Sequence, residues 1–164
     1  MAVDDDQAFA LASRNLALAE KQGNGTPPDI IAPCSACYLV LMKAKVALAQ
    51  KEGKGGRIRQ ALKENDLPYK GKVQVRHPLD VFIKDIGIDQ IKAKVQKPLS
   101  GMKVASYYGC QIVRPYSTFD DPYNPMSMDM IMEALGAEII DWPLKTRCCG
   151  GSLTGTIAEV GQRL

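Results

Sequence analysis

Apolar and polar residues alternate along the chain with two different periods, which predict short buried strands separated by helices. Residues 4–22 form the first predicted helix, because three aspartates favour a helix start and Gly23 ends the apolar pattern. Residues 29–33 are apolar and rich in β-branched side chains, so they predict a buried strand. Residues 38–51 return to a helical pattern, and the first half is therefore predicted to be helix, strand and helix.

The rest of the chain continues this alternation with more interruptions. The glycines of residues 53–56 are predicted to break the pattern before a short helix over residues 57–65. Ser127 is the predicted cap of a later helix, and Gly136 ends it. The other predicted elements are an extended piece at 73–75, helix at 78–95 interrupted near Gly87, strands at 102–107 and 137–142, an ordered loop at 114–125, a helix at 128–135 and a last helix from Ser152.

This order of elements predicts the fold class. We expect an α/β protein of two similar strand-helix modules, residues 1–97 and 98–164, each with a small, mostly parallel sheet. Every cysteine group follows a predicted strand, and ligands of open α/β sheets collect beyond the carboxyl ends of strands. The pattern therefore places the cysteines at strand ends.

Composition and charge exclude several classes. The 164 residues are 46% hydrophobic and 24% charged, an ordinary globular composition, and the net charge of +3 gives no argument for nucleic acid. No apolar run approaches the roughly 20 residues of a membrane span. The acidic start differs from a signal peptide, so we expect a cytoplasmic protein. Seven basic residues against one acid between residues 43 and 63 indicate a solvated face, with docking of an acidic partner as the alternative.

The run Cys148-Cys149-Gly150-Gly151 is the most informative stretch. Adjacent cysteines cannot readily bond to each other, because the ring they would close is strained. Two neighbouring thiolates suit a metal cluster, in which each sulfur reaches a different iron. Glycines let the backbone approach such a cluster, and a helix starting near Ser152 would point its N–H groups at cluster sulfur. Buried small residues are the ordinary alternative.

Three further cysteines complete the inventory of five. Cys34 and Cys37 form a Cys-x-x-Cys pair at a predicted strand-to-helix junction, where the helix N-terminus favours the thiolate. Taken alone, Cys110 would more often be a buried thiol, but its place after the predicted strand 102–107 favours a ligand. Since cytoplasmic thiols stay reduced, this set favours metal or redox chemistry over a disulfide framework. His77, the sole histidine, precedes a proline and is assigned a structural role.

These residues resemble the cysteine-rich CCG domain and, within it, the B subunit of heterodisulfide reductase. The resemblance is carried by Cys110, by the run from Cys148 to Gly151 and by Cys34-Ser35-Ala36-Cys37-Tyr38. Supporting stretches are residues 105–111, 119–122 and 135–138. The resemblance covers essentially the whole chain.

The resemblance implies two tandem modules, each with a lone cysteine, then Cys-Cys-Gly, then Cys-x-x-Cys. Each module of the family wraps a non-cubane four-iron cluster of the 4Fe-4S type, and a small-molecule disulfide such as CoM-S-S-CoB is reduced between them. It also implies partner subunits, an iron–sulfur protein and a flavoprotein, which supply electrons. Cys34, Cys37, Cys110, Cys148 and Cys149 are thereby the expected cluster ligands.

The chain departs from this family pattern in the distribution of its cysteines. Residues 1–97 resemble the C-terminal part of a first module and keep Cys34 and Cys37. Residues 98–164 resemble the N-terminal part of a second module and keep Cys110, Cys148 and Cys149. The chain thus resembles an internal fragment of the heterodisulfide reductase B subunit, and we expect it to be inactive by itself, with its sites lacking a cluster or holding zinc instead.

Two other functions compete with this hypothesis. Zinc held by the Cys-x-x-Cys pair and the adjacent cysteines would make a structural or interaction module without redox activity. A thioredoxin-like dithiol at Cys34 and Cys37 is the third interpretation. It leaves the other three cysteines without a role.

Overall fold

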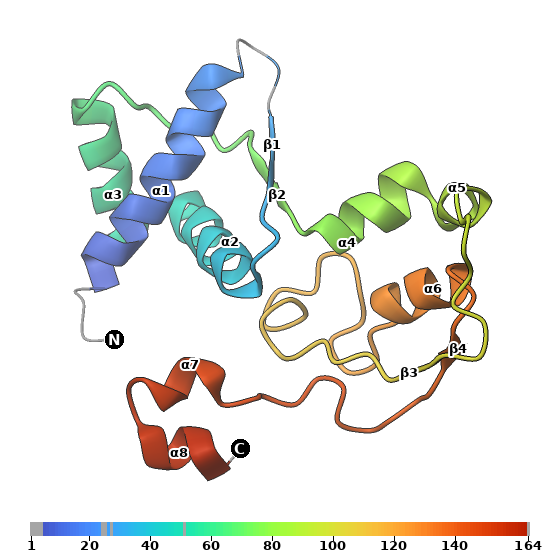
Figure 1. Ribbon diagram of the computed structural model, residues 1–164. Coiled ribbons are helices and arrows are strands. Elements are labelled where there is room, and N and C mark those ends of the chain that lie inside the picture. Colours follow the sequence, from blue (N-terminus) through green and yellow to red (C-terminus); the bar gives the residue numbers. More distant parts are fainter. Residues whose placement is uncertain (1–4, 24–25, 27, 51, 164) are drawn as a thin grey trace. The chain divides into compact units, whose positions relative to one another are not determined.

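The computed structural model describes residues 5–23, 26, 28–50 and 52–163, which belong to two compact units (Figure 1). Unit 1 ends at His77 and unit 2 begins at Pro78. The helical segment that begins at Pro78 packs on a helix near residue 130, so it belongs to the second unit. The boundary of the two family modules between residues 97 and 98 stays a prediction.

Unit 1 is built on three helices, α1 (Asp5–Gln22), α2 (Ser35–Ala49) and α3 (Gly53–Glu64). Helix α1 packs against both α2 and α3, and α2 packs against α3. The largest fully buried side chains between these elements are Leu16, Tyr38, Leu48 and Val73. The predicted helix over residues 4–22 is confirmed from Asp5 on, and Asp4 lies outside the described residues.

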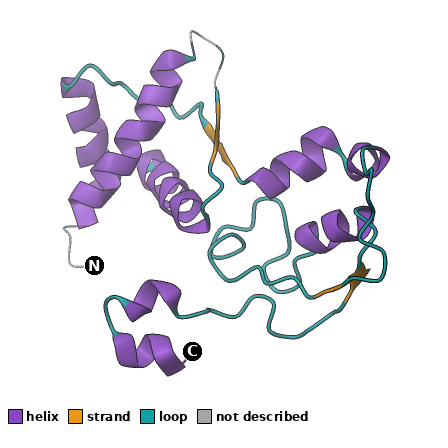
Figure 2. Cartoon of the chain, in the orientation of Figure 1, coloured by secondary structure: helices purple, strands orange, loops and turns teal. Residues whose placement is uncertain are grey.

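Two short strands complete unit 1, and the first of them leads into α2 (Figure 2). Strand β1 (Asp29–Ile31) pairs in parallel with β2 (Gln74–Arg76), with Ile30 opposite Val75. The Ala32 N–H donates to the Arg76 carbonyl at 2.9 Å, which extends the pairing to the edge of the cysteine pair. Both predicted strands of this half are therefore present.

The glycines of residues 53–56 do not break the chain as predicted, because α3 begins at Gly53. Gly55 is buried, and a Cβ at this position would collide with the Ala47 carbonyl of α2. Glycine therefore serves here for close helix packing and not for flexibility. Sequence alone cannot separate these two uses of glycine.

Replacing Gly55 by alanine is expected to destabilise unit 1 by about 1–3 kcal/mol, because the added methyl overpacks the α2–α3 contact. In an open helix the same change would stabilise by roughly 0.5–1 kcal/mol, so the sign is diagnostic. Urea unfolding followed by circular dichroism measures it. Gly155→Ala is the control, because nothing lies within 4 Å of a Cβ there; an equally destabilised control would contradict the interpretation.

Unit 2 opens with one interrupted helical segment. It consists of α4 (Pro78–Val81), the π-helical turn η1 (Phe82–Ile86) and α5 (Ile88–Ala93). The interruption falls at Gly87, whose φ of 84° is in the left-handed region. This confirms the break predicted near Gly87. Both α4 and α5 pack on α6 (Ser127–Ala134).

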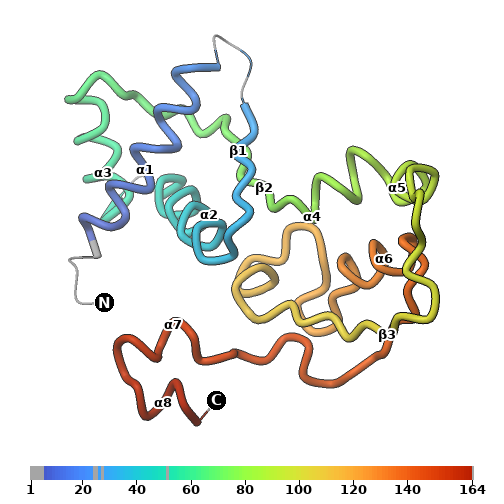
Figure 3. Tube along the Cα trace, viewed as in Figure 1, coloured from blue at the N-terminus to red at the C-terminus, as the bar shows by residue number. Residues whose placement is uncertain are grey.

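The sheet of unit 2 consists of β3 (Lys103–Val104) and β4 (Glu138–Ile139), paired in parallel. Both strands are shorter than the predicted segments 102–107 and 137–142. Beyond β4 the chain reaches α7 (Gly151–Thr154) and α8 (Ala158–Arg163), which form a packed hairpin in the Cα trace (Figure 3). Each unit thus has a small parallel sheet with helices, as the predicted α/β class requires.

A small core fixes the segment that follows β3. Tyr108, Ile112 and Val113 are buried together, and Leu79 and Met128 pack against them. Because Cys110 lies inside this stretch, its loop is held by packing on both sides. The backbone around Cys110 is therefore set by the core of unit 2.

Two features bear on surfaces. No helix of the described residues is long and apolar enough to cross a membrane. Three basic residues of α3 are paired within unit 1: Lys54 and Arg57 bind Asp6, and Arg59 donates to the Tyr69 and Leu48 carbonyls. This pairing supports the interpretation of the basic stretch as a solvated face.

Candidate functional site

Cys34 and Cys37 lie together in unit 1, where β1 leads into α2. Both thiols are exposed. The backbone N–H of Cys37, its thiol and the N–H of Ala36 favour the Cys34 thiolate, so the pKa of Cys34 is lowered. The pKa of Cys37 is raised, because its thiol donates to Cys34 and lies beside that sulfur. The contacts at this strand-to-helix junction therefore favour the thiolate form of Cys34 over that of Cys37.

The other three cysteines gather in unit 2. Burial and the neighbouring Cys148 thiol raise the pKa of Cys110. Loss of hydration and the nearby thiols of Cys149, Cys148 and Cys110 raise the pKa of Tyr107. Tyr107 therefore interacts electrostatically with all three thiols. Cys110 and the Cys148-Cys149 pair, which are far apart in sequence, therefore belong to the same region of unit 2.

The two glycines after the cysteine pair direct backbone N–H groups at sulfur. Gly150 N–H donates to Cys148 Sγ, and Gly151 N–H donates to Cys149 Sγ, both at 3.5 Å. Gly150 has a φ of 75°, and a Cβ on it would strike the Gly161 carbonyl of α8. Only glycine suits this position. Helix α7 starts at Gly151, one residue before the predicted start.

Hydrogen bonds to main-chain carbonyls hold the two cysteine-bearing loops together. The Lys145 carbonyl accepts the Tyr108 and Gly109 N–H groups at 2.8 and 3.1 Å. The Tyr107 hydroxyl donates to the Arg147 carbonyl at 2.6 Å, and Arg114 donates to the Thr146 carbonyl. Each peptide carbonyl of residues 145–147 therefore has a partner from the Cys110 side.

The start of α6 is bound to the same region through Tyr108. Its buried hydroxyl accepts the N–H groups of Met128 and Asp129 at 2.9 and 3.0 Å, and burial raises the pKa of Tyr108 to about 12. The Asp120 carboxylate accepts the Met126 and Ser127 N–H groups at 2.9 and 2.8 Å.

The predicted Ser127 cap is wrong. The helix begins at Ser127 itself, and the Ser127 hydroxyl has no hydrogen-bond partner among the described residues. A carboxylate and a phenol from earlier in the chain satisfy the orphan N–H groups of the first turn instead.

Replacing Tyr108 by phenylalanine is expected to destabilise unit 2 by about 1–3 kcal/mol, because two N–H groups at the α6 start lose their acceptor while the ring stays. Urea unfolding monitored by circular dichroism measures the change. Tyr123→Phe is the control, since Tyr123 is 79% exposed. Equal stabilities for the two variants would show that the Tyr108 hydroxyl contributes nothing.

Three charged residues near the site, Lys145, Asp129 and Asp120, had no role predicted from the sequence. The Lys145 amine lies 3.3 Å from an Asp129 carboxylate oxygen, and both side chains are buried. A buried lysine leaves no sequence signal, because most lysines are exposed. His77 is buried, and its ring lies 5.8 Å from that of Tyr38, edge to face. This packing agrees with the structural role assigned to it.

The thiol groups fit one kind of metal chemistry better than another. Within the described part of the chain, no three His, Cys, Asp or Glu side chains are placed to hold one metal ion. An iron–sulfur cluster has a different requirement, because its thiolate ligands bind separate irons and sulfide fills the interior. Three neighbouring thiols, two of them bonded to backbone N–H groups, fit that requirement in donor type.

Fold and site together define an α/β protein in which each unit has a group of thiols beyond its parallel strands. The CCG cysteine-rich domain family matches residues 1–42 and 104–164, and the chain belongs to this family. The match contains all five cysteines.

Curated relatives carry the names of reductase subunits. The chain is 34% identical to the B subunit of a ferredoxin/F420H2-dependent CoB-CoM heterodisulfide reductase of Methanosarcina acetivorans, over 92% of this chain and 50% of the relative. It is 35% identical to an 8-methylmenaquinol:fumarate reductase membrane anchor subunit of Wolinella succinogenes, over 90% of this chain and 50% of the relative. A protein of Archaeoglobus profundus named as similar to the heterodisulfide reductase B subunit is 32% identical over 94% of this chain and 52% of its own. The chain spans about half the length of these relatives.

Proposed function

We propose that this chain is part of a redox subunit in which Cys110, Cys148 and Cys149 bind one iron–sulfur cluster and Cys34 and Cys37 bind another. The clusters are of the non-cubane four-iron type, and the subunit uses them to reduce a small-molecule disulfide. When bound, such a cluster supplies single electrons to the substrate sulfur. The protein supplies thiolates, their orientation and the N–H groups that stabilise their charge.

One observation carries this proposal: hydrogen bonds hold the Cys110 loop against the loop that carries Cys148 and Cys149. These sulfurs come from two loops, and each loop follows a strand. A structural zinc site requires four ligands around one point, and the described residues hold no group of three or more candidate ligands around one point. The thiol group therefore favours a multi-iron cluster.

The proposed substrate and partners follow from the relatives. Two of them are named as B subunits of heterodisulfide reductases or as proteins like them, which supports a disulfide such as CoM-S-S-CoB. Since the sequence has no flavin or nicotinamide motif, electrons are supplied by an iron–sulfur subunit and a flavoprotein subunit.

The test uses the protein purified anaerobically from its native host through a tag, with whatever subunits accompany it. We expect a brown protein with sulfide-to-iron charge-transfer absorption, stoichiometric iron and sulfide, and disulfide-dependent oxidation of a reduced dye. A colourless protein with stoichiometric zinc would refute the proposal and support the zinc module. The same sample shows whether flavin co-purifies.

A second candidate is favoured by one observation, the 35% identity to a subunit named for menaquinol:fumarate reduction. In this alternative the same clusters would pass electrons between a quinol and a partner subunit. The two candidates separate on the purified complex, because only the first oxidises a reduced dye with a thiol disulfide. Dye oxidation that requires fumarate, with no response to disulfide, would favour the second.

A further inference from the structure

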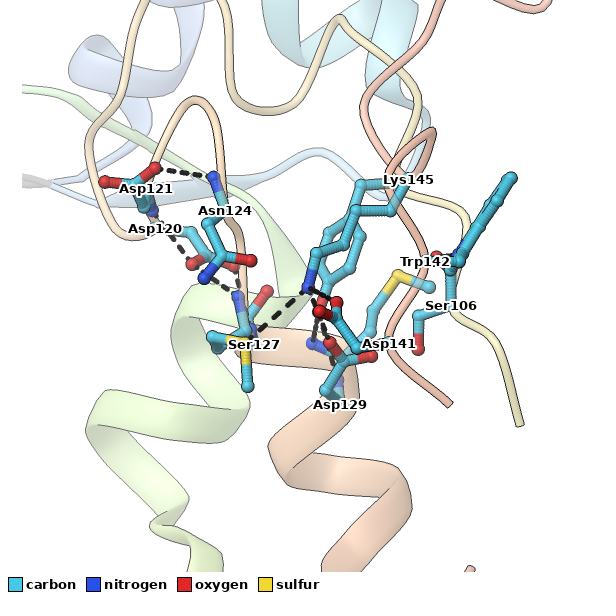
Figure 4. Close-up of polar contacts among 12 residues, drawn as sticks. Ser106, Asp120, Asp121, Asn124, Ser127, Asp129, Asp141, Trp142 and Lys145 are labelled. Atoms are coloured by element: carbon cyan, nitrogen blue, oxygen red, sulfur yellow. Dashed lines mark hydrogen bonds and ion pairs between the residues drawn. The ribbon is translucent and has the colours of Figure 1, made fainter. Parts of the chain in front are cut away.

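The side chain of Lys145 is turned into the interior of unit 2, although it stands just before the cysteine pair. Figure 4 shows it running toward Asp129 at the start of α6, with the carboxylate of Asp141 also beside its amine. Its amine lies 3.3 Å from a carboxylate oxygen of each aspartate. The Lys145 and Asp129 side chains are 7% and 5% exposed, whereas Asp141 is 87% exposed.

This difference in burial identifies Asp129 as the partner that matters. An exposed carboxylate such as Asp141 adds little to an ion pair. Breaking a buried pair is costly, because one charge then remains in a medium of low polarity without its partner. A buried pair adds little net stability compared with apolar residues, and its best-attested use is to fix one arrangement of the chain.

Lys145 and Asp129 belong to a closed set of contacts with Tyr108. The Tyr108 N–H donates to the Lys145 carbonyl, the Tyr108 hydroxyl accepts the Asp129 N–H, and the Asp129 carboxylate binds the Lys145 amine. Three segments that are distant in sequence therefore meet in one ring of contacts. Cys110 follows this ring on one segment, and Cys148 follows it on another.

From this geometry we propose that Lys145, held by Asp129, is a positioning residue that keeps the Cys148-Cys149 loop against the Cys110 loop. The role of Lys145 in cluster binding rests on the proposed function, whereas its role in positioning the thiols is independent of that function. Without the buried charge pair, the Cys148 loop loses the anchor made by its own buried side chain and keeps only the hydrogen bonds that its peptide carbonyls accept. The Cys110 and Cys148 sulfurs then meet less often.

The experiment measures how readily the Cys110 and Cys148 sulfurs come into contact. It uses the full chain, purified in reduced form and free of iron. Diamide takes two electrons and two protons from a pair of thiols and leaves a disulfide between them. Samples are quenched by alkylation at intervals, and mass spectrometry follows the Cys110–Cys148 disulfide. The Cys34–Cys37 disulfide, which forms in unit 1, is the internal control.

Lys145→Met keeps the length of the side chain and removes its charge. We expect it to slow the Cys110–Cys148 disulfide at least about tenfold, because misplacement of reacting groups lowers their effective concentration. The Cys34–Cys37 rate should not change. Lys145→Arg is expected to retain most of the rate, since arginine keeps the charge and can bind the same carboxylate.

Lys84→Met is the control, because it removes another lysine of unit 2 from an ion pair with an aspartate, Asp80 at 2.8 Å, but a lysine that is 51% exposed and not buried. It should leave both disulfide rates unchanged. Circular dichroism checks folding, and if Lys145→Met is unfolded, Asp129→Asn decides, with a smaller drop expected.

A wild-type rate for folded Lys145→Met would overturn the inference, and so would a wild-type chain that forms no Cys110–Cys148 disulfide. The proposed function is tested separately. If the native protein contains no iron but the diamide rates behave as described, the cluster proposal fails and the positioning inference stands.

Discussion

Serine in place of Cys148 is expected to remove the iron–sulfur absorption contributed by the unit 2 site in the complex from the native host. Serine replaces a soft thiolate with a hydroxyl that stays protonated near neutral pH. Loss of a hydrogen-bond partner around a metal ligand already costs up to about 100-fold in affinity, and loss of the ligand itself should exceed that. Iron and sulfide analysis with visible spectra provides the measurement.

Two further variants give this result its meaning. Ser152→Ala changes an exposed residue of α7, close to the cysteine pair, and should leave iron content unaltered. Cys34→Ser should remove iron associated with unit 1 and spare the signal lost in Cys148→Ser. Identical losses in both cysteine variants would show that the five cysteines share one site, contrary to the proposal.

The 164-residue chain alone is expected to show no disulfide reduction above a control without protein. Its curated relatives are about twice as long, since the chain spans 50% of each of two of them. Its cysteines divide into a group of two in unit 1 and a group of three in unit 2. The proposal assigns these groups to different clusters, so neither group equals the full set of five cysteines of a family module.

The measurement is dye-linked turnover with CoM-S-S-CoB after anaerobic reconstitution with iron and sulfide. The complex from the native host serves as the positive control under the same conditions. Turnover by the isolated chain, with about four irons bound, would refute this prediction and show that the chain assembles a complete site by itself.

The features that sequence predicted well depend on local pattern. Helix α1, the strand before Cys34 and the interruption at Gly87 are each set by neighbouring residues, and all three are present. The placement of thiols after strands followed from the same alternation. The meeting of Cys110 with Cys148 came from the family resemblance, because spacing alone gives no distance between loops.

The features that sequence missed depend on long-range contacts. Asp120 caps a helix that begins several residues later, and Ser127, which looks like a cap, has its hydroxyl turned to no partner in the described residues. From the sequence, Gly55 indicates a break between helices, whereas in the structure it allows close packing against the Ala47 carbonyl of the neighbouring helix. Lys145 looks like a solvent-exposed lysine until Asp129 is found next to it. In each case the partner lies on another element.

The contact between Gly150 and Gly161 has a consequence for how the Cys-Cys-Gly motif varies among related proteins. The missing side chain of Gly150 makes room for the Gly161 carbonyl, and a Cβ at Gly161 would meet Thr154 at 2.8 to 2.9 Å. The structural requirement of the motif therefore extends beyond the consecutive residues Cys-Cys-Gly, because it also includes Gly161 in α8. Among homologues with this hairpin, the two glycines should be inherited together, and chains that lose one should replace the other or lack the α7–α8 turn.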